Sequence, residues 1–296
     1  LDNQILDNKS ISDTFSINQN LLASNILSGV LSDYVEKEVE KDKQQLVQSY
    51  IKKILLYVDI GQRIDKGLTH YESYKNNDWA TKPIYSTGSK LFKFTNQIAI
   101  VDDIVQPIKD KIPAKAYYID LYFRRIFLTN VALFTLATEM ICDLLNLKAE
   151  DIERQEIIEF SICYGLSIQV INDIADFVPA SQELETVGRK STDTLSDLKN
   201  KNITLPLIFH LNRNQELLVS KYLKEEREGK ESIVELFAEE ISNEIKKSFA
   251  ASETINISKI LGKKEEKYIK STSKPSYYLH DMCHIAQDNR FYRWFY

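Results

Sequence analysis

The chain has 296 residues, of which only 8 are Gly and 6 are Pro. This scarcity of turn residues argues against a β-sandwich, a barrel or a glycine-dependent nucleotide-binding fold, and it predicts a mostly helical protein. The formal net charge of −5 disfavours nucleic acid as a partner, because nucleic-acid-binding domains are usually basic. Three cysteines without a CxxC pair suit a reducing compartment, so we expect a cytoplasmic protein.

The N-terminal segment is polar and has no basic start followed by an apolar run, so we expect no secretory signal peptide. Residues 1–19 are expected to be a flexible N-terminus. Residues 20–296 contain no internal repeat and no low-complexity linker. We therefore expect them to form a single all-α domain.

Helical spacing of apolar residues predicts most of the elements. Pro107 is expected to stop one helix and Pro113 to open the next, because proline fits only the first turn. The longest apolar stretch, 126–147, contains polar and charged residues, which predicts a buried helix and not a transmembrane segment. The expected helices, in chain order, cover residues 20–39, 46–58, 87–105, 113–147 and 151–177, followed by a polar connector at 178–200, a helical pair from 203 and a charged helical tail at 215–270.

Two acidic segments interrupt these apolar helices. The first is Asp102-Asp103-Ile104-Val105-Gln106, and the second is Asn172-Asp173-Ile174-Ala175-Asp176. Carboxylates on an apolar face are costly unless something compensates them. Mg²⁺ commonly bridges a few carboxylates to a phosphate ligand, so two such segments together favour a metal and diphosphate site. Either segment alone is also compatible with ordinary pairing to lysines.

The second acidic segment resembles the second Asp-rich motif of the trans-polyprenyl diphosphate synthase family. The segment Gly165-Leu166-Ser167-Ile168-Gln169 precedes it at the offset seen in that family, and Asp197-Leu198 with Thr204-Leu205-Pro206 resembles a downstream family segment. Upstream, Gly61-Gln62-Arg63-Ile64-Asp65-Lys66 resembles the family's GKRxRP segment. The resemblance covers roughly residues 20–215 and implies an all-α, isoprenoid-synthase-type helical bundle with a central apolar cavity.

The resemblance implies a homodimeric prenyltransferase that ionises an allylic isoprenyl diphosphate with more than one Mg²⁺, using isopentenyl diphosphate as the acceptor. Arg124 and Arg125 are candidates for diphosphate contacts, with an ordinary ion pair as the alternative. The implied catalytic residues are Asp102, Asp103, Asp173 and Asp176, with Gln106 and Asn172 as further metal ligands. The implied substrate-binding residues are Arg63, Lys66, Gln169, Lys190, Lys199, Phe94 and Ile98.

Several positions depart from the family pattern. Gln106 replaces the last carboxylate of the first motif, and Asn172 replaces the first carboxylate of the second. The family's Lys-Thr pair would fall near Thr129-Asn130-Val131, where no lysine stands. In the GKRxRP segment, Gln62 and Asp65 replace Lys and Arg. A diphosphate needs several charge-assisted donors, so the loss of these cationic positions and of the Lys-Thr lysine predicts a weakened acceptor site. A terpene synthase (cyclase) and a non-catalytic subunit of a heteromeric prenyl synthase therefore remain as alternative functions.

The two acidic motifs are 71 residues apart, from Asp102 to Asp173, which is about two helices fewer than in the family. A bundle that lacks two helices would leave a large apolar face uncovered. A second register reduces this problem. In it, Gln106 and Asp110 resemble a later Gln…Asp segment of the family, and a degraded first motif falls near Asp59–Asp65.

Overall fold

The computed structural model describes residues 17–68, 97–177, 195–199, 202–213, 238–247 and 249–271. All elements in these ranges are helices, which confirms the predicted all-α class. The α-helices are α2 (Ile17–Glu38), α3 (Lys41–Leu68), α6 (Gln97–Lys111), α7 (Ala116–Ile126), α8 (Ala132–Leu144), α9 (Ile152–Ala175), α11 (Ser196–Lys199), α12 (Leu205–Arg213), α15 (Ala238–Lys247) and α16 (Phe249–Ser271). Most of the predicted connector at 178–200, and the first part of the helix predicted over 87–105, lie outside the described residues.

The prediction that a helix stops at Pro107 is wrong, because α6 continues through this residue to Lys111. Val105 and Ile108 are buried on either side of Pro107, whereas the proline itself is exposed. The missing backbone N–H therefore costs one hydrogen bond on the solvent side of the helix, while the buried side keeps its packing.

The long helix predicted over 113–147 is divided into several parts. It opens with a 3₁₀ turn at Pro113–Lys115, continues as α7, widens into a π-helical turn at Phe127–Val131, and then becomes α8. We call Phe127–Val131 the π turn. It lies deep in the molecule, since Phe127, Leu128 and Val131 are buried. The prediction of a helix over 151–177 is confirmed by α9.

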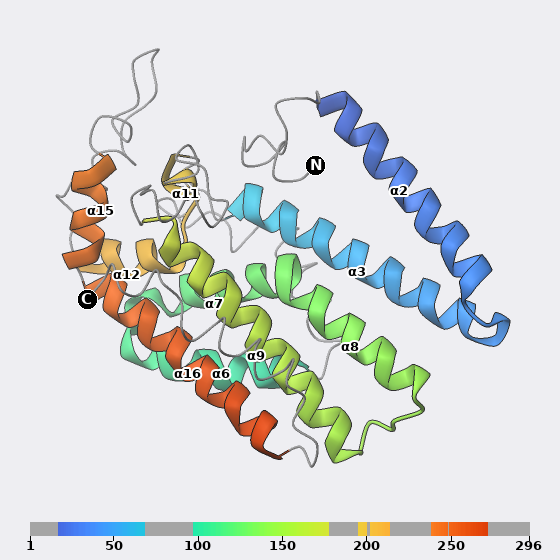
Figure 1. Cartoon of the computed structure of the whole chain (residues 1–296). Helices are drawn as coiled ribbons and strands as arrows, with labels where there is room; N and C mark the ends of the chain where they lie inside the picture. Colours follow the sequence, from blue (N-terminus) through green and yellow to red (C-terminus); the bar gives the residue numbers. More distant parts are fainter. Residues whose placement is uncertain are drawn as a thin grey trace.

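Five helices lie side by side in the order α2, α3, α8, α9 and α16, and α6 and α7 pack behind α9 and α16 (Figure 1). The core between these layers is filled by large apolar side chains that are fully buried. Among them are Phe123, Phe127, Leu166, Phe177 and Phe209. Cys142 and Cys163 are buried free cysteines, as expected for small core residues.

Neighbouring helices α3 and α8 are antiparallel. The Tyr50 hydroxyl near the start of α3 donates to Asp143 near the end of α8. The Arg154 guanidinium of α9 donates to the same carboxylate. Burial disfavours the charged form of Asp143, but the hydrogen bonds from Tyr50 and Arg154 hold its pKa below the usual value. One carboxylate thus ties together three helices.

Two glycines allow close helix contacts around the π turn. A Cβ atom added at Gly61 of α3 would lie 2.7 Å from Cγ2 and 2.8 Å from the backbone N of Thr129. A Cβ atom added at Gly165 of α9 would lie 3.1 Å from the Cα of Val131. The π turn therefore packs closely between α3 and α9, and a larger residue at Gly61 or Gly165 would push these helices away from it.

Two stretches, Ala116–Leu144 and Ile152–Ala175, are long and apolar enough to cross a bilayer by length and composition. Their apolar windows are 44% and 67% buried inside the protein, respectively. The charged side chains of Arg125 and Asp173 also lie within these stretches and point into the bundle, where they are buried. This burial is what core helices of a helical bundle show.

Candidate functional site

Polar side chains gather at the buried interface where α7, the π turn and α9 meet. Tyr122 and Arg125 come from α7, Asn130 from the π turn, and Gln169 and Asp173 from α9. Tyr122, Arg125 and Asp173 are buried, and Asp173 is only 1% exposed. We call these five residues the Asp173 cluster.

The π turn brings Tyr122 and Asn130 onto one side of the helix. A regular α-helix rotates about 100° per residue, so residues eight apart would differ by about 80°. One residue inserted by a π turn makes the eight-residue step behave like seven, which leaves a difference of only about 20°. Both side chains therefore reach α9, where Tyr122 contacts Asp173 and Asn130 contacts Gln169.

Both carboxylate oxygens of Asp173 accept hydrogen bonds. The Tyr122 hydroxyl donates to Oδ2 at 2.7 Å, and the Gln169 side-chain amide donates to Oδ1 at 2.6 Å. Asn130 in turn donates its amide N–H to the Gln169 oxygen. This last bond orients the Gln169 amide so that its nitrogen faces Asp173.

The charge of Asp173 is disfavoured in this environment. Burial raises the pKa of its carboxyl group to about 7, and the nearby Asp197 carboxylate acts in the same direction. The Arg125 guanidinium and the hydrogen bonds from Tyr122 and Gln169 oppose the rise without cancelling it. The Arg125 guanidinium also lies 5.3 Å from the centre of the Tyr122 ring. A cation beside Asp173 would relieve the imbalance.

Asp176 accepts hydrogen bonds from the backbone N–H groups of residues 195–197. Leu195 has a positive φ of 57°, which is costly for a residue with a branched side chain. Its N–H donates to the Asp176 carbonyl, while the N–H groups of Ser196 and Asp197 donate to the two Asp176 carboxylate oxygens at 3.0 and 3.1 Å. These three bonds join the end of α9 to the start of α11.

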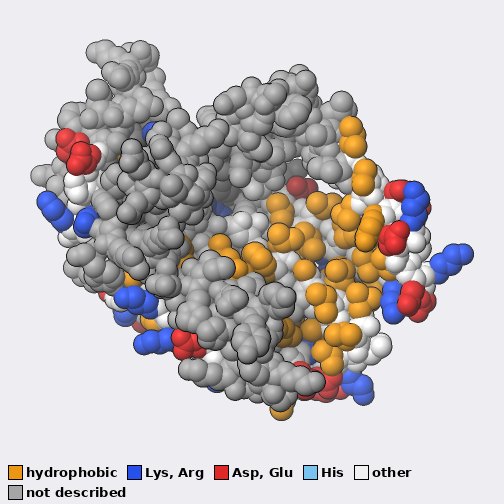
Figure 2. Space-filling view, viewed as in Figure 1, with side chains coloured by type: hydrophobic (Ala, Val, Ile, Leu, Met, Phe, Trp, Pro, Cys, Tyr) orange, Lys and Arg blue, Asp and Glu red, His pale blue; other side chains and the backbone are white. Residues whose placement is uncertain are grey.

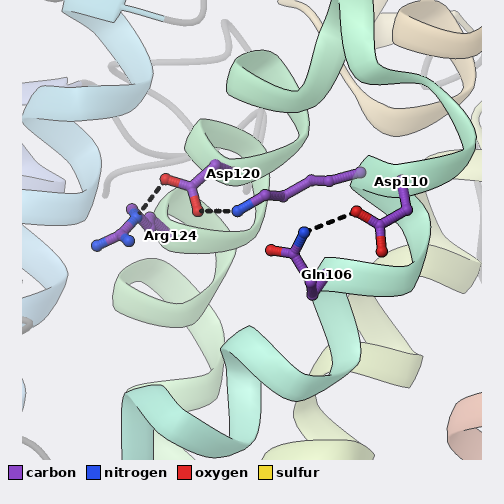
Figure 3. A network of polar contacts seen from close by, with 5 residues as sticks. Gln106, Asp110, Asp120 and Arg124 are labelled. Atoms are coloured by element: carbon purple, nitrogen blue, oxygen red, sulfur yellow. Dashed lines mark hydrogen bonds and ion pairs between the residues drawn. The ribbon is translucent and has the colours of Figure 1, made fainter.

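The first acidic motif lies on the exposed side of α6. Asp102, Asp103 and Gln106 are exposed on α6, whereas the intervening Ile104 and Val105 are buried. The Gln106 amide donates to Asp110, one turn further along the helix (Figure 3). Gln106 and Asp110 are the two residues that, in the alternative register, resemble a later Gln…Asp segment of the trans-polyprenyl diphosphate synthase family.

Figure 3 also shows the polar contact between α6 and α7. Asp120 accepts from the Arg124 Nε at 2.6 Å and lies 3.5 Å from the Lys109 Nζ. Arg124 therefore belongs to an ion pair within α7, which is the alternative that the sequence left open, and Lys109 of α6 shares the Asp120 carboxylate. Its neighbour Arg125 turns inward to the Asp173 cluster.

The structure does not show a complete metal site between the two acidic motifs in the part of the chain that it describes. Among the described residues, no three His, Cys, Asp or Glu side chains come close enough to share a metal ion. Gln169 and Asp173 do meet, as their spacing predicts. The role of Asp102, Asp103 and Gln106 as metal ligands stays a prediction.

The remaining predicted residues lie in several places. Asn172 is exposed on α9, and Lys199 is half-buried on α11. Arg63 and Lys66 belong to the last part of α3, and Ile98 belongs to the start of α6. For these three residues the structure describes the helical backbone only. Phe94 and Lys190 lie outside the described residues altogether.

Sequence reasoning missed Tyr122, Asn130 and Leu195 as parts of the site. In the sequence, Tyr122 is one more aromatic residue in an apolar helix, and Asn130 is a polar interruption of the longest apolar stretch at the place of a missing lysine. The one available signal was the polar Asn130 inside the longest apolar stretch. A buried polar side chain needs a partner, and here that partner is Gln169.

We expect Tyr122→Phe to raise the pKa of Asp173 further above 7, because the variant removes a donor that stabilises the charged carboxylate. A hydrogen bond to a charged group contributes roughly 1.5–3 kcal/mol, which corresponds to a rise of roughly one to two pH units. Carbon-13 NMR titration of labelled aspartates measures it. Tyr34→Phe, at an exposed position of α2, should leave the titration unchanged, and an unchanged pKa in Tyr122→Phe would contradict the assigned bond.

Comparison with solved structures shows the fold. The chain superposes on a geranylgeranyl pyrophosphate synthase with a TM-score of 0.63 and 15% identity, covering 96% of this chain and 74% of that one. A polyprenyl synthase from Caulobacter crescentus CB15, solved with calcium and isoprenyl diphosphate, gives a TM-score of 0.50 and 14% identity over 98% of this chain and 94% of that one. The predicted helical bundle is thereby confirmed as this fold.

Sequence comparison gives a shorter match. A protein from Cyanophora paradoxa described as a prenyl transferase is 43% identical over 54 residues, which are 18% of this chain. The match spans only 15% of the length of that relative. No family model matches the chain.

Proposed function

We propose that the chain, which has the fold of the geranylgeranyl and polyprenyl pyrophosphate synthases, is a prenyltransferase that ionises an allylic isoprenyl diphosphate. The observation that carries the proposal is the Asp173 cluster at the end of α9. It places a carboxylate with a raised pKa beside a buried guanidinium in the interior of an otherwise apolar bundle. Such a perturbed group is typical of functional sites.

Asp173 of the second motif fits Mg²⁺ as a carboxylate ligand. Each carboxylate oxygen of Asp173 has about two acceptor positions, of which the hydrogen bonds from Tyr122 and Gln169 use one each. Mg²⁺ usually binds one or two carboxylates and completes its octahedron with water and substrate phosphates. When bound, it would stabilise the charge of the leaving pyrophosphate. The side chains of Tyr122 and Gln169 would hold Asp173 in place.

Arg125 would add a fixed positive charge to this site. Its guanidinium is buried on the same side of α7 as Tyr122, one helical turn before the position where the family pattern has lysine. A planar guanidinium binds phosphate oxygens in pairs, which a lysine does not do. We propose that Arg125 compensates in part for the missing lysine.

The proposal is tested by incubating the chain and Mg²⁺ with geranyl, farnesyl or geranylgeranyl diphosphate, with and without isopentenyl diphosphate. Release of pyrophosphate together with longer diphosphates supports prenyl transfer. Release together with volatile hydrocarbons supports a terpene synthase. If all three diphosphates stay intact, the enzymatic proposal fails.

Asp102→Ala tests the first motif separately. A large loss of pyrophosphate release is expected if Asp102 binds metal in the closed complex. An unchanged rate would assign the first motif elsewhere and favour the register near Asp59–Asp65. Glu240→Ala is the control, because Glu240 is an exposed carboxylate of α15 that belongs to neither acidic motif nor to the alternative register.

One observation favours a second candidate, a non-catalytic subunit. Asp102 and Asp103 face away from the core, and the described residues hold no group of three metal-ligating side chains. Such a chain would keep the fold and support an active partner. Restored activity when the inactive chain is mixed with a catalytic prenyl synthase subunit would distinguish this function from an inactive preparation.

A further inference from the structure

Two carboxylates of the second acidic motif lie in the interior of the bundle. Asp173 is 1% exposed and Asp176 is 4% exposed, whereas the charged side chains coloured in Figure 2 lie mainly around the rim of the molecule. A buried carboxylate is costly unless donors or a cation compensate it. The partners of each carboxylate therefore indicate what it does.

Asp176, at the end of α9, caps the start of α11. The first N–H groups of a helix have no partner inside it, and the side chain directly before the helix usually binds them. In α11 this position is Leu195, whose side chain cannot accept a hydrogen bond. The Asp176 carboxylate accepts instead from the Ser196 N–H at 3.0 Å and from the Asp197 N–H at 3.1 Å, with one oxygen for each. The cap of α11 is thus supplied by α9.

The donors to Asp176 differ in kind from the donors to Asp173. Asp173 accepts from the side chains of Tyr122 and Gln169, which can adjust by rotation about single bonds when a cation approaches. Asp176 accepts from backbone N–H groups, and a third backbone bond, from the Leu195 N–H to the Asp176 carbonyl, holds the same segment. Backbone donors that lose their acceptor inside a protein must find another. Asp176 should therefore keep these bonds when a cation binds at Asp173.

These bonds hold Asp197 close to the Asp173 cluster. Asp176 lies about one helical turn after Asp173, and the N–H of Asp197 is bonded to it. Leu195 and Leu198, on either side of Asp197, are fully buried and anchor the segment in the core. The half-buried Asp197 side chain therefore has a fixed starting point beside the end of α9.

The Asp197 carboxylate adds a second negative charge next to Asp173. Burial is the largest cause of the raised pKa of Asp173 and of Tyr122, and the Asp197 carboxylate raises both pKa values further. Asn172, which stands where the family pattern has the first carboxylate of the motif, is neutral and exposed. Asp197 therefore supplies a charge that Asn172 lacks.

We propose that Asp176 is a positioning residue and not a metal ligand, and that it holds Asp197 beside Asp173 as the second carboxylate of the cation site. This role, which rests on the proposed function, differs from the metal-binding role that the family resemblance implies for Asp176. Mg²⁺ usually binds one or two carboxylates together with water and substrate phosphates, so Asp173 and Asp197 would suffice.

Amide hydrogen exchange tests the position. Asparagine has one acceptor oxygen where aspartate has two, so Asp176→Asn cannot hold both N–H groups. We expect the amides of Ser196 and Asp197 to exchange at least tenfold faster in this variant, measured by NMR, while the amide of the buried Ile245 on α15 is unchanged. Asp197→Asn should leave exchange slow, because both backbone bonds remain. Unchanged exchange in Asp176→Asn overturns the proposal.

Cation affinity tests what the position achieves. Mn²⁺ is the probe, because it prefers the same oxygen ligands as Mg²⁺ and its free form is measured by electron paramagnetic resonance. Asp176→Asn and Asp197→Asn should each lower the affinity at least tenfold, and the double variant should bind no more weakly than Asp197→Asn, because Asp176 acts only through Asp197. Glu153→Gln, which removes an exposed carboxylate at the other end of α9, should leave the affinity unchanged.

Two results separate this proposal from the proposed function. Losses that multiply in the double variant would make Asp176 a metal ligand itself, which overturns the positioning role and leaves the proposed function intact. A wild-type chain that binds no Mn²⁺ contradicts the proposed function and the role of Asp197 in the cation site.

Discussion

Asp173→Asn should raise the free energy of unfolding at neutral pH while it abolishes pyrophosphate release. At pH 8 the wild-type carboxylate is charged although burial and Asp197 disfavour that charge, and Arg125 compensates only in part. Asparagine keeps the shape and stays neutral. The variant should therefore be more stable than the wild type, and it should lose activity because it lacks the charge that would bind a cation.

The sign of the pH effect follows from the direction of the pKa shift. The folded-state pKa of Asp173 is about 7, whereas its ordinary value is 3.8. Between these values the unfolded chain loses the proton and the folded chain keeps it. The contribution of Asp173 to the free energy of unfolding is therefore full below about pH 4, falls as the pH rises to about 7, and remains low above that pH. The total fall is roughly a few kcal/mol.

Urea unfolding of the wild type and Asp173→Asn at several pH values measures this difference. The advantage of the variant should be absent near pH 4 and largest above pH 7. Asp143→Asn is a matched control of opposite sign, because the folded-state pKa of Asp143 is lowered and the lost charge should cost stability at neutral pH. Parallel pH profiles for the wild type and Asp173→Asn would show that Asp173 is not the group that titrates.

Gly61→Ala should lower the free energy of unfolding by about 1–3 kcal/mol, the usual cost of overpacking a core. The added methyl group would lie within 2.9 Å of three atoms, one of them the backbone nitrogen of Thr129. A backbone atom cannot rotate away, so α3 and the π turn must separate. Asn130 of the π turn holds Gln169 of the Asp173 cluster by a hydrogen bond, so a shift of the π turn should displace the cluster. We therefore expect the substitution to reduce activity as well.

Gly29→Ala is the matched control, since no atom lies within 4 Å of the added methyl group on α2. Alanine at an exposed helical position stabilises by roughly 0.5–1 kcal/mol relative to glycine. The two Gly→Ala variants should therefore differ in sign in the same thermal or urea unfolding experiment. Equal effects at both positions would contradict the close contact at Gly61.

The helices could be predicted from the sequence because apolar spacing reports which helix side is buried, and the type of bundle was implied by the resemblance to the trans-polyprenyl diphosphate synthase family. The segment Gly165–Asp176 also indicates the place of the proposed site, and the predicted proximity of Gln169 and Asp173 is confirmed by their hydrogen bond. Gly61 and Gly165 were noted as motif positions, and the structure gives them a packing role beside the π turn.

The rest could not be predicted, for identifiable reasons. Helical spacing assumes a constant rotation of about 100° per residue. It therefore cannot reveal the inserted residue that brings Asn130 and Tyr122 onto the same side of the helix. The backbone bonds from Ser196 and Asp197 to Asp176 depend on the positive φ of Leu195, which no pattern of leucines indicates. The exposure of Asp102 and Asp103 depends on the neighbours of α6, which spacing alone does not supply.

The π turn also sets the rotational phase of everything that follows it on α8. If one residue were deleted from Phe127–Val131, α8 would turn by about 100° about its axis. Leu133 and Ile141, which are exposed on α8, would then turn to a different side of the helix, and Asn130 would lose its hydrogen bond to Gln169. The one inserted residue therefore fixes both the polar contact with α9 and the orientation of α8, so natural length changes in this segment should be rarer than substitutions.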